Sequence, residues 1–252
     1  MKAHSLSLIC LALLVSGCIS NEPQLGVQDK EAAAAYNLQL GIDYFSQGNL
    51  VQAKEKLDRS LVQNPKNAQT HAAAGLLYER LNELDKADQY YSRAVDLDSG
   101  NGNLLNMYGV FLCHRGEWAR GEKLALQAAN NQLYKTPEMA YYNAGSCAQD
   151  AGKSQLAEQH YRRALEVNQK FSSALLRLAE LKFTANDFMS ARGFLDRFHA
   201  AAQATAESLW LGARIERSSG NESPATEYIR RLKTEFPASP QAAAVLEAER
   251  KK

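Results

Sequence analysis

Apolar residues recur along this chain at the three- and four-residue spacing that is typical of amphipathic α-helices. The helical segments themselves repeat every 34 residues, and the period is marked by six small residues: Gly41, Gly75, Gly109, Gly145, Ala179 and Ala213. One gap, between the third and fourth markers, is two residues longer than the others. A fixed period in this range indicates a stacked-repeat protein, which offers a long surface for binding another chain.

Each period predicts two antiparallel helices. We place six windows at residues 34–67, 68–101, 102–135, 138–171, 172–205 and 206–239. A second small residue follows twelve residues after each marker and lets the two helices approach closely: Ala53, Ala87, Gly121, Ala157, Ala191 and Ala225. The fifteenth position of every window is Gly or Asn, the residues that most readily adopt the left-handed conformation at a helix end: Gly48, Asn82, Gly116, Gly152, Asn186 and Gly220. The turn within each helix pair is therefore predicted six times.

This pattern resembles the tetratricopeptide repeat. The first window carries the repeat's signature residues at Asn37, Leu40, Gly41, Tyr44, Ala53, Leu57, Ser60 and Pro65. The last two windows depart from it, because Lys182 and Glu216 stand where an aromatic residue is expected. The resemblance implies an all-α fold, a right-handed superhelical solenoid of six tetratricopeptide repeats over residues 34–239. Residues 240–252 contain strong helix formers and are expected to form a C-terminal capping helix.

The first 17 residues are predicted to be a cleaved lipoprotein signal peptide. Lys2 precedes an apolar run, residues 6–15, that is too short to span a bilayer. The sequence Val15-Ser16-Gly17-Cys18 then matches the bacterial lipobox, so Cys18 is expected to carry the lipid anchor. The alternative is an ordinary secretory signal with an incidental cysteine.

Ile19, rather than Asp, follows the lipobox cysteine, and analogy with lipoprotein sorting then favours the outer membrane. Residues 18–33 are predicted to be a flexible tether between the lipid and the first repeat, since residues 20–31 are polar and include Pro23 and Gly26. No other stretch is long and apolar enough to span a membrane.

Charge and motifs give no indication of nucleic-acid binding or catalysis. Removal of the signal peptide deletes one base, Lys2, from the 29 basic residues and leaves 28 against 28 acidic ones. The histidines lack metal-ligand spacing, and Ser146 is not part of a Gly-x-Ser-x-Gly elbow. We therefore predict a protein without enzymatic activity, metal, cofactor or small-molecule substrate.

In tetratricopeptide-repeat proteins, positions two, five, nine and twelve of each window line the concave face. At the N-terminal end of this chain, four such residues are too apolar for a solvated surface: Leu38, Ile42, Phe45 and Leu76. They predict a protein-binding groove for an apolar peptide or helix, unless residues 31–35 fold over them. In the last window the same positions are polar and basic: Glu207, Trp210, Arg214 and Arg217.

Two cysteines, Cys113 and Cys147, remain after the signal peptide and the lipobox are set aside. They fall on the first helices of adjacent repeats, and an oxidising compartment would permit a disulfide. Neighbouring helix axes lie about 8–10 Å apart, whereas bridged Cα atoms must lie within about 7 Å. Only an inward-facing pair can therefore form the bond, and two buried free thiols are the alternative.

Three features together resemble the type IV pilus biogenesis lipoproteins that act as secretin pilotins. They are the lipobox followed by six repeats, the stretch Asn106–Cys113 (NMYGVFLC), and the stretch from Tyr134 to Ala148 that contains the two-residue insertion. The resemblance implies a periplasmic adaptor, anchored to the outer membrane, that binds secretin subunits and promotes their delivery and assembly. We expect the protein to be a monomer. In that family the cysteines matching Cys113 and Cys147 are expected to pair. A lipoprotein scaffold for outer-membrane barrel assembly or for cell-wall hydrolases is the alternative function.

Overall fold

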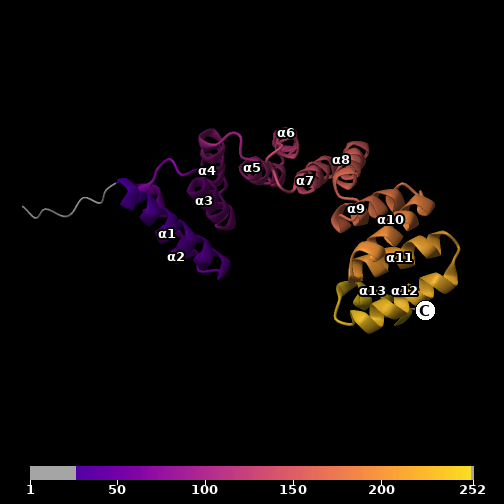
Figure 1. Cartoon of the computed structure of the whole chain (residues 1–252). Coiled ribbons are helices and arrows are strands. Elements are labelled where there is room, and N and C mark those ends of the chain that lie inside the picture. Colours follow the sequence, from indigo (N-terminus) through magenta and orange to yellow (C-terminus); the bar gives the residue numbers. More distant parts are fainter. Residues whose placement is uncertain (1–26, 251–252) are drawn as a thin grey trace, which may run out of the picture.

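The computed structural model describes residues 27–250, which form thirteen α-helices and no strand (Figure 1). The first six are α1 (Val27–Ser46), α2 (Leu50–Gln63), α3 (Ala68–Arg80), α4 (Leu84–Leu97), α5 (Gly102–His114) and α6 (Trp118–Ala129). The next six are α7 (Pro137–Asp150), α8 (Ser154–Val167), α9 (Ser172–Thr184), α10 (Phe188–Ala201), α11 (Ala206–Ser218) and α12 (Glu222–Glu235). The last is α13 (Pro240–Arg250), which packs on α11 and α12 as the predicted cap.

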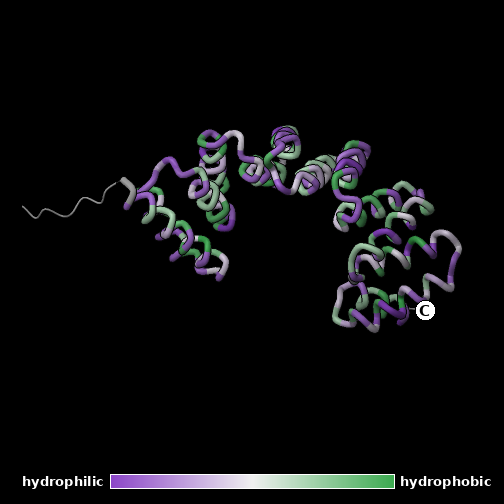
Figure 2. Tube along the Cα trace, viewed as in Figure 1, coloured by the Kyte–Doolittle hydropathy of each residue, from purple (hydrophilic) through white to green (hydrophobic). Residues whose placement is uncertain are grey.

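Consecutive helices pair into six antiparallel hairpins that stack in a curved row (Figure 1). First helices of successive hairpins also contact each other in four cases: α1 with α3, α3 with α5, α5 with α7, and α9 with α11. Hydrophobic and polar residues alternate along the helices (Figure 2), and the buried ones form successive clusters from α1 to α13. The all-α superhelical repeat fold is therefore confirmed.

The six predicted turns all contain a left-handed residue. The φ angles are positive at Gly48, Asn82, Gly116, Gly152, Asn186 and Gly220, between 59° and 80°. At the first turn, the N–H of Asn49 donates to Tyr44 O (2.9 Å) and that of Gly48 donates to Phe45 O (3.0 Å). These bonds satisfy carbonyls that a helix end would otherwise leave without a donor.

The glycine markers let side chains of the second helix lie directly against the backbone of the first. A Cβ added at Gly75 would lie 2.8 Å from the ring of Tyr91, and one at Gly145 would lie 2.6 Å from the ring of Tyr161. Both tyrosines are fully buried. The small residue of the period thus makes room for a large residue of the same repeat.

The predicted tether is wrong over residues 27–33, which form the first turns of α1. The segment contains Asp29 in its first turn, which complements the positive helix N-terminus, and continues into four alanines. No helix breaker separates it from the first repeat window. Residues 18–26, Cys18, the signal peptide 1–17 and residues 251–252 lie outside the described residues. Among the helices described, none combines the length and apolar character needed to cross a bilayer.

Candidate protein-binding surface

The predicted N-terminal groove lies on α1 and α3, which contact each other. Leu38 and Phe45 are only partly exposed, because they pack against the core cluster of Ala53, Leu57 and Leu77. Ile42 and Leu76 remain 43 % and 37 % exposed. Two of the four predicted residues are therefore engaged in the core, and two leave apolar surface exposed; the groove itself stays a prediction.

Residues 31–35 do not cover this surface. They belong to α1 itself, N-terminal to Leu38, and extend the helix along its axis. A continuous helix cannot fold back on its own side chains, so the alternative in which this segment covers the groove is not realised.

The centre of the first-helix layer is polar. The side-chain amide of Asn143 on α7 donates to Asn106 Oδ1 on α5 at 2.9 Å, and both residues are half-buried. This bond crosses the junction between repeats three and four, where the chain carries its two-residue insertion. The buried ring of Tyr134 anchors the inserted loop against Gly102, where an added Cβ would lie 2.7 Å from that tyrosine.

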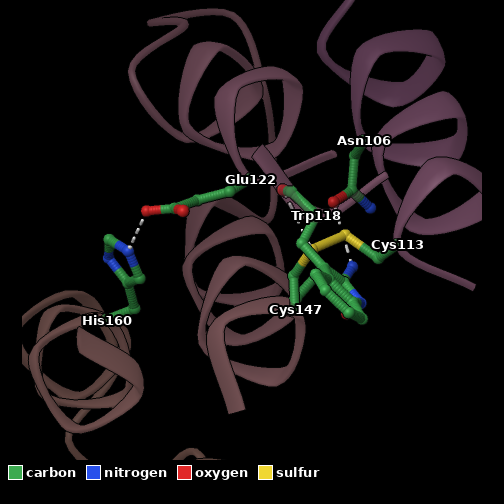
Figure 3. The surroundings of a disulfide bond; sticks show 7 residues. Asn106, Cys113, Trp118, Glu122, Cys147 and His160 are labelled. Carbon is green, nitrogen blue, oxygen red and sulfur yellow. Dashed lines mark hydrogen bonds and ion pairs between the residues drawn. A yellow bond between two sulfur atoms is a disulfide. The ribbon is translucent and has the colours of Figure 1, made fainter. Parts of the chain in front are cut away.

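The same junction carries a disulfide between Cys113 on α5 and Cys147 on α7 (Figure 3). Their Cα atoms lie 5.4 Å apart, and both residues are buried. Gly121 on α6 makes room for the bond, since a Cβ there would lie 2.3 Å from Cys113 Sγ. The inward-facing geometry that the bond requires is thus present in the structure.

A second contact joins repeats three and four through their second helices, α6 and α8. His160 Nε2 on α8 lies 2.9 Å from Glu122 Oε1 on α6, and both side chains are largely buried (Figure 3). The disulfide joins first helices and the His160–Glu122 pair joins second helices. Repeats three and four are therefore fixed to each other through both layers.

The C-terminal end of the concave face is hollowed into a cavity of about 360 Å³. It is lined by α7, α9, α11 and α13, through Gln149, Glu180, Phe183, Thr184, Glu207, Trp210, Leu211, Arg214 and Gln241. Glu207, Trp210 and Arg214 of the last window are therefore brought together here with residues of three other helices. Arg217 does not line the cavity.

Lys182 and Glu216, which stand where the repeat pattern has an aromatic residue, form ion pairs between repeats. Lys182 Nζ lies 2.8 Å from Glu158 Oε1, and Arg192 donates to both oxygens of Glu216 at 2.5 and 2.8 Å. Glu216 is 6 % exposed and also accepts from Asn221. Burial alone would raise the pKa of Glu216, but the hydrogen bonds from Arg192 and Asn221 outweigh it and hold that pKa below its ordinary value.

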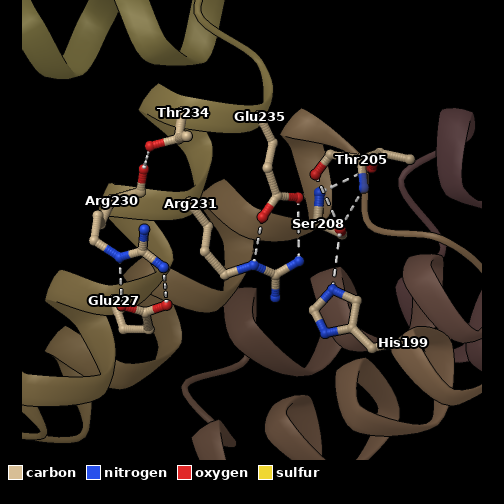
Figure 4. Close-up of polar contacts among 8 residues, drawn as sticks. All are labelled: His199, Thr205, Ser208, Glu227, Arg230, Arg231, Thr234 and Glu235. Carbon is tan, nitrogen blue, oxygen red and sulfur yellow. Dashed lines mark hydrogen bonds and ion pairs between the residues drawn. The ribbon is translucent and has the colours of Figure 1, made fainter.

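A serine–histidine contact, which sequence motifs did not indicate, lies at the start of α11 (Figure 4). His199 Nε2 is 3.1 Å from Ser208 Oγ, and that hydroxyl also bonds the backbone of Thr205. Ser208 is fully buried and forms a capping box with Thr205. This serine therefore caps the start of α11. The Thr-x-x-Ser spacing is the sequence signal that could have identified the cap.

Within residues 27–250, no three His, Cys, Asp or Glu side chains are grouped so that they could hold a metal ion. The exposed side chains of the first helices include apolar ones on α1 and α3, and aromatic ones with charges of both signs on α9 and α11. The fold and this surface define a tetratricopeptide-repeat protein. The tetratricopeptide-repeat family model matches residues 68–101 and 140–171.

Comparison with known proteins identifies the family more closely. The chain is 30 % identical over 243 residues to the type IV pilus assembly protein PilF of Pseudomonas aeruginosa, covering 95 % of this chain and 96 % of PilF. It belongs to the PilF family.

Two solved structures agree with this assignment. The structure of P. aeruginosa PilF superposes with a TM-score of 0.74 at 29 % identity, covering 87 % of this chain and 99 % of PilF. The crystal structure of PilW, described as a widely conserved type IV pilus biogenesis factor, gives a TM-score of 0.75 at 28 % identity, covering 84 % and 98 % of the two chains.

Proposed function

We propose that this protein is a pilotin: a periplasmic adaptor, anchored to the outer membrane through Cys18, that binds secretin subunits. In this role it promotes their delivery to the outer membrane and their multimerisation during type IV pilus biogenesis. The observation that carries the proposal is the similarity to PilF along nearly the whole chain. A repeat solenoid with an apolar surface at one end is suited to holding a segment of another protein.

In this mechanism the apolar groove residues Ile42 and Leu76 receive an apolar segment of the secretin subunit. Each buried methylene of such a contact contributes about 0.8 kcal/mol, so a few side chains supply useful affinity. Covering that segment also keeps it from associating with other subunits before it reaches the membrane. The lipid on Cys18 would direct the complex to the outer membrane, with about 0.8 kcal/mol contributed per buried CH₂ of its chains.

A deletion strain tests the function. Secretin multimers in outer-membrane fractions should fall, and expression of the wild-type chain should restore them. Cys18→Ser should leave the protein soluble in the periplasm and the multimers reduced. If secretin assembly is intact in the deletion strain while barrel assembly or cell-wall hydrolysis is impaired, the scaffold alternative replaces the pilotin.

A pull-down of the secretin tests the groove separately. Ile42→Asp and Leu76→Asp should each reduce capture about tenfold or more, because a charge replaces an apolar contact. Both side chains are exposed, so the variants are expected to fold. Val51→Asp is the matched control, since Val51 is 77 % exposed on α2, outside the groove. Equal capture by all three variants would remove the groove from the proposal.

A further inference from the structure

The C-terminal cavity has one acidic end. Arg177 Nη1 lies 2.7 Å from Glu180 Oε2 on its own helix and 3.9 Å from Glu207 Oε1 on α11. Two carboxylates therefore share a single guanidinium. Burial, reinforced by the neighbouring Glu207, raises the pKa of Glu180 even though Arg177 opposes it. Glu180 is the nearer partner of the guanidinium, and Glu207 is half-exposed, so Glu207 can pair with an incoming cation.

The opposite end is basic. The guanidinium carbon of Arg214 lies 4.4 Å from the centre of the Phe183 ring, so the ring holds the cation in place. Within residues 27–250, Arg214 makes no ion pair or hydrogen bond, and its side chain is exposed. Its planar N–H groups are therefore free to donate to a carboxylate, in the paired geometry that arginine favours.

An aromatic side chain separates the two ends. Glu207, Trp210 and Arg214 are spaced at three and four residues on α11 and line the same cavity. Trp210 is half-buried against the last core cluster, which leaves part of its ring open to a ligand. The cavity thus presents a negative group, an indole and a positive group in a row.

The spacing of this row matches an extended polypeptide. Glu207 and Arg214 are seven positions apart on α11, which is about 10 Å along the helix axis. In an extended chain every second side chain lies on the same face, so side chains at positions i, i+2 and i+4 span about 13 Å between their Cα atoms, and the flexible ends of Lys and Glu reach groups about 10 Å apart. The side chain between the charges would then contact Trp210.

We propose that this cavity is a second peptide-binding site, which takes an extended partner segment with a basic residue, an apolar residue and an acidic residue. The basic side chain pairs with Glu180 and Glu207, the apolar one packs on Trp210, and the acidic one pairs with Arg214. The charge complementarity of the two ends selects this occupant. A segment carrying one sign of charge would meet an unfavourable group at one end.

The experiment uses the two tryptophans of the chain, Trp118 and Trp210, as reporters. Full-length protein in detergent micelles, labelled with ¹⁵N-tryptophan, is titrated with short Gly/Ser peptides that carry Lys and Glu four positions apart, with Leu midway between them. The indole resonance of Trp210 should shift saturably, and that of Trp118, which lies on α6, should not.

Three control peptides have the same length and keep the Leu. One carries two Lys, one carries two Glu, and one carries Lys and Glu next to each other. Each should bind about tenfold more weakly than the matched peptide, as loss of one charged contact implies. Arg214→Gln should weaken the matched peptide about tenfold. Arg217→Gln, an exposed arginine outside the cavity, should leave its affinity unchanged.

No shift of Trp210 with the matched peptide would overturn the proposal. The proposal would also be overturned if all four peptides bound equally well, or if Arg214→Gln bound the matched peptide as tightly as the wild-type chain does. Circular dichroism checks that Arg214→Gln and Arg217→Gln remain folded. Because no secretin is present, failure here leaves the pilotin proposal standing, and failure of the secretin assays leaves this site standing.

Discussion

The buried ion pair between repeats five and six gives a quantitative prediction. Replacing Arg192 by Met keeps most of the side chain's volume but removes both hydrogen bonds to Glu216. Glu216 then remains almost fully buried with Asn221 as its one remaining donor among the described residues. Breaking a buried pair in this way costs about 3–5 kcal/mol. The Arg192 side chain is 38 % exposed, which places the expected loss near the lower limit, about 3 kcal/mol.

Thermal unfolding at neutral pH, followed by circular dichroism, measures the loss. For a chain of this size about 3 kcal/mol corresponds to a fall in Tm of roughly 6–12 °C. The control is Arg230→Met, which removes the two-bond pair with Glu227 on the surface of α12 (Figure 4). Both of those side chains are more than half exposed, so the control should cost less than about 1 kcal/mol.

The pH dependence distinguishes a charge effect from a packing effect. In the wild-type chain the pKa of Glu216 is lowered, so its contribution to stability is present above the unfolded pKa of about 4.5 and is lost as the pH falls through the folded pKa. In Arg192→Met, burial is no longer opposed by the guanidinium, and Glu216 protonates more readily. The stability difference between the two proteins should therefore shrink as the pH falls toward 4. A difference that stays constant with pH would refute the buried-charge explanation.

The remaining predictions concern the junction of repeats three and four and the start of α11. Gly121→Ala should destabilise the chain by about 1–3 kcal/mol in thermal unfolding, because the new Cβ would meet Cys113 Sγ; an unchanged Tm would contradict this contact. Thiol titration of the denatured, unreduced protein should find Cys113 and Cys147 unreactive, and two reactive thiols would rule out their bond. Reduction should cost about 2–4 kcal/mol, since the bond closes a loop with a separation of 34 residues. Burial, with Arg231 nearby, lowers the pKa of His199. The contribution of His199 to stability is therefore complete above about pH 6.5 and should decline as the pH falls below that value. Urea unfolding of His199→Gln at several pH values should show a flatter decline.

The features that the sequence predicted well are those governed by local backbone requirements. A left-handed residue is needed at each of six turns, and Gly or Asn is recognisable at every one of them, including Asn82 and Asn186. The period itself follows from small residues such as Gly75 that must face a large side chain of the same repeat. Neither inference requires knowledge of how repeats stack. The start of α1 was missed for a related reason: the repeat window defines where a repeat begins, whereas helix propensity continues upstream to Val27.

The features that the sequence did not predict depend on contacts between repeats. Lys182 and Glu216 were visible as departures from the repeat pattern, but their partners, Glu158 and Arg192, belong to other helices at no fixed spacing. The cavity residues Glu207, Trp210 and Arg214 were visible as polar groove positions. Their combination with Phe183 and the cap residue Gln241 became evident only from the stacking of α9, α11 and α13.

The insertion between repeats three and four lies between the apolar surface at the N-terminal end and the charged cavity at the C-terminal end. A solenoid changes shape by small rotations between neighbouring repeats, and an irregular spacing interrupts the regular contacts at one junction. Here that junction carries the disulfide, the Asn143–Asn106 bond and the His160–Glu122 pair. These contacts fix the position of the first three repeats, with their apolar surface, relative to the last three, with their charged cavity. A partner that engages both surfaces would then meet them at a set separation, so the second contact forms at high effective concentration once the first has formed. For such a partner, the cross-links would set how the two surfaces act together, in addition to their contribution to stability.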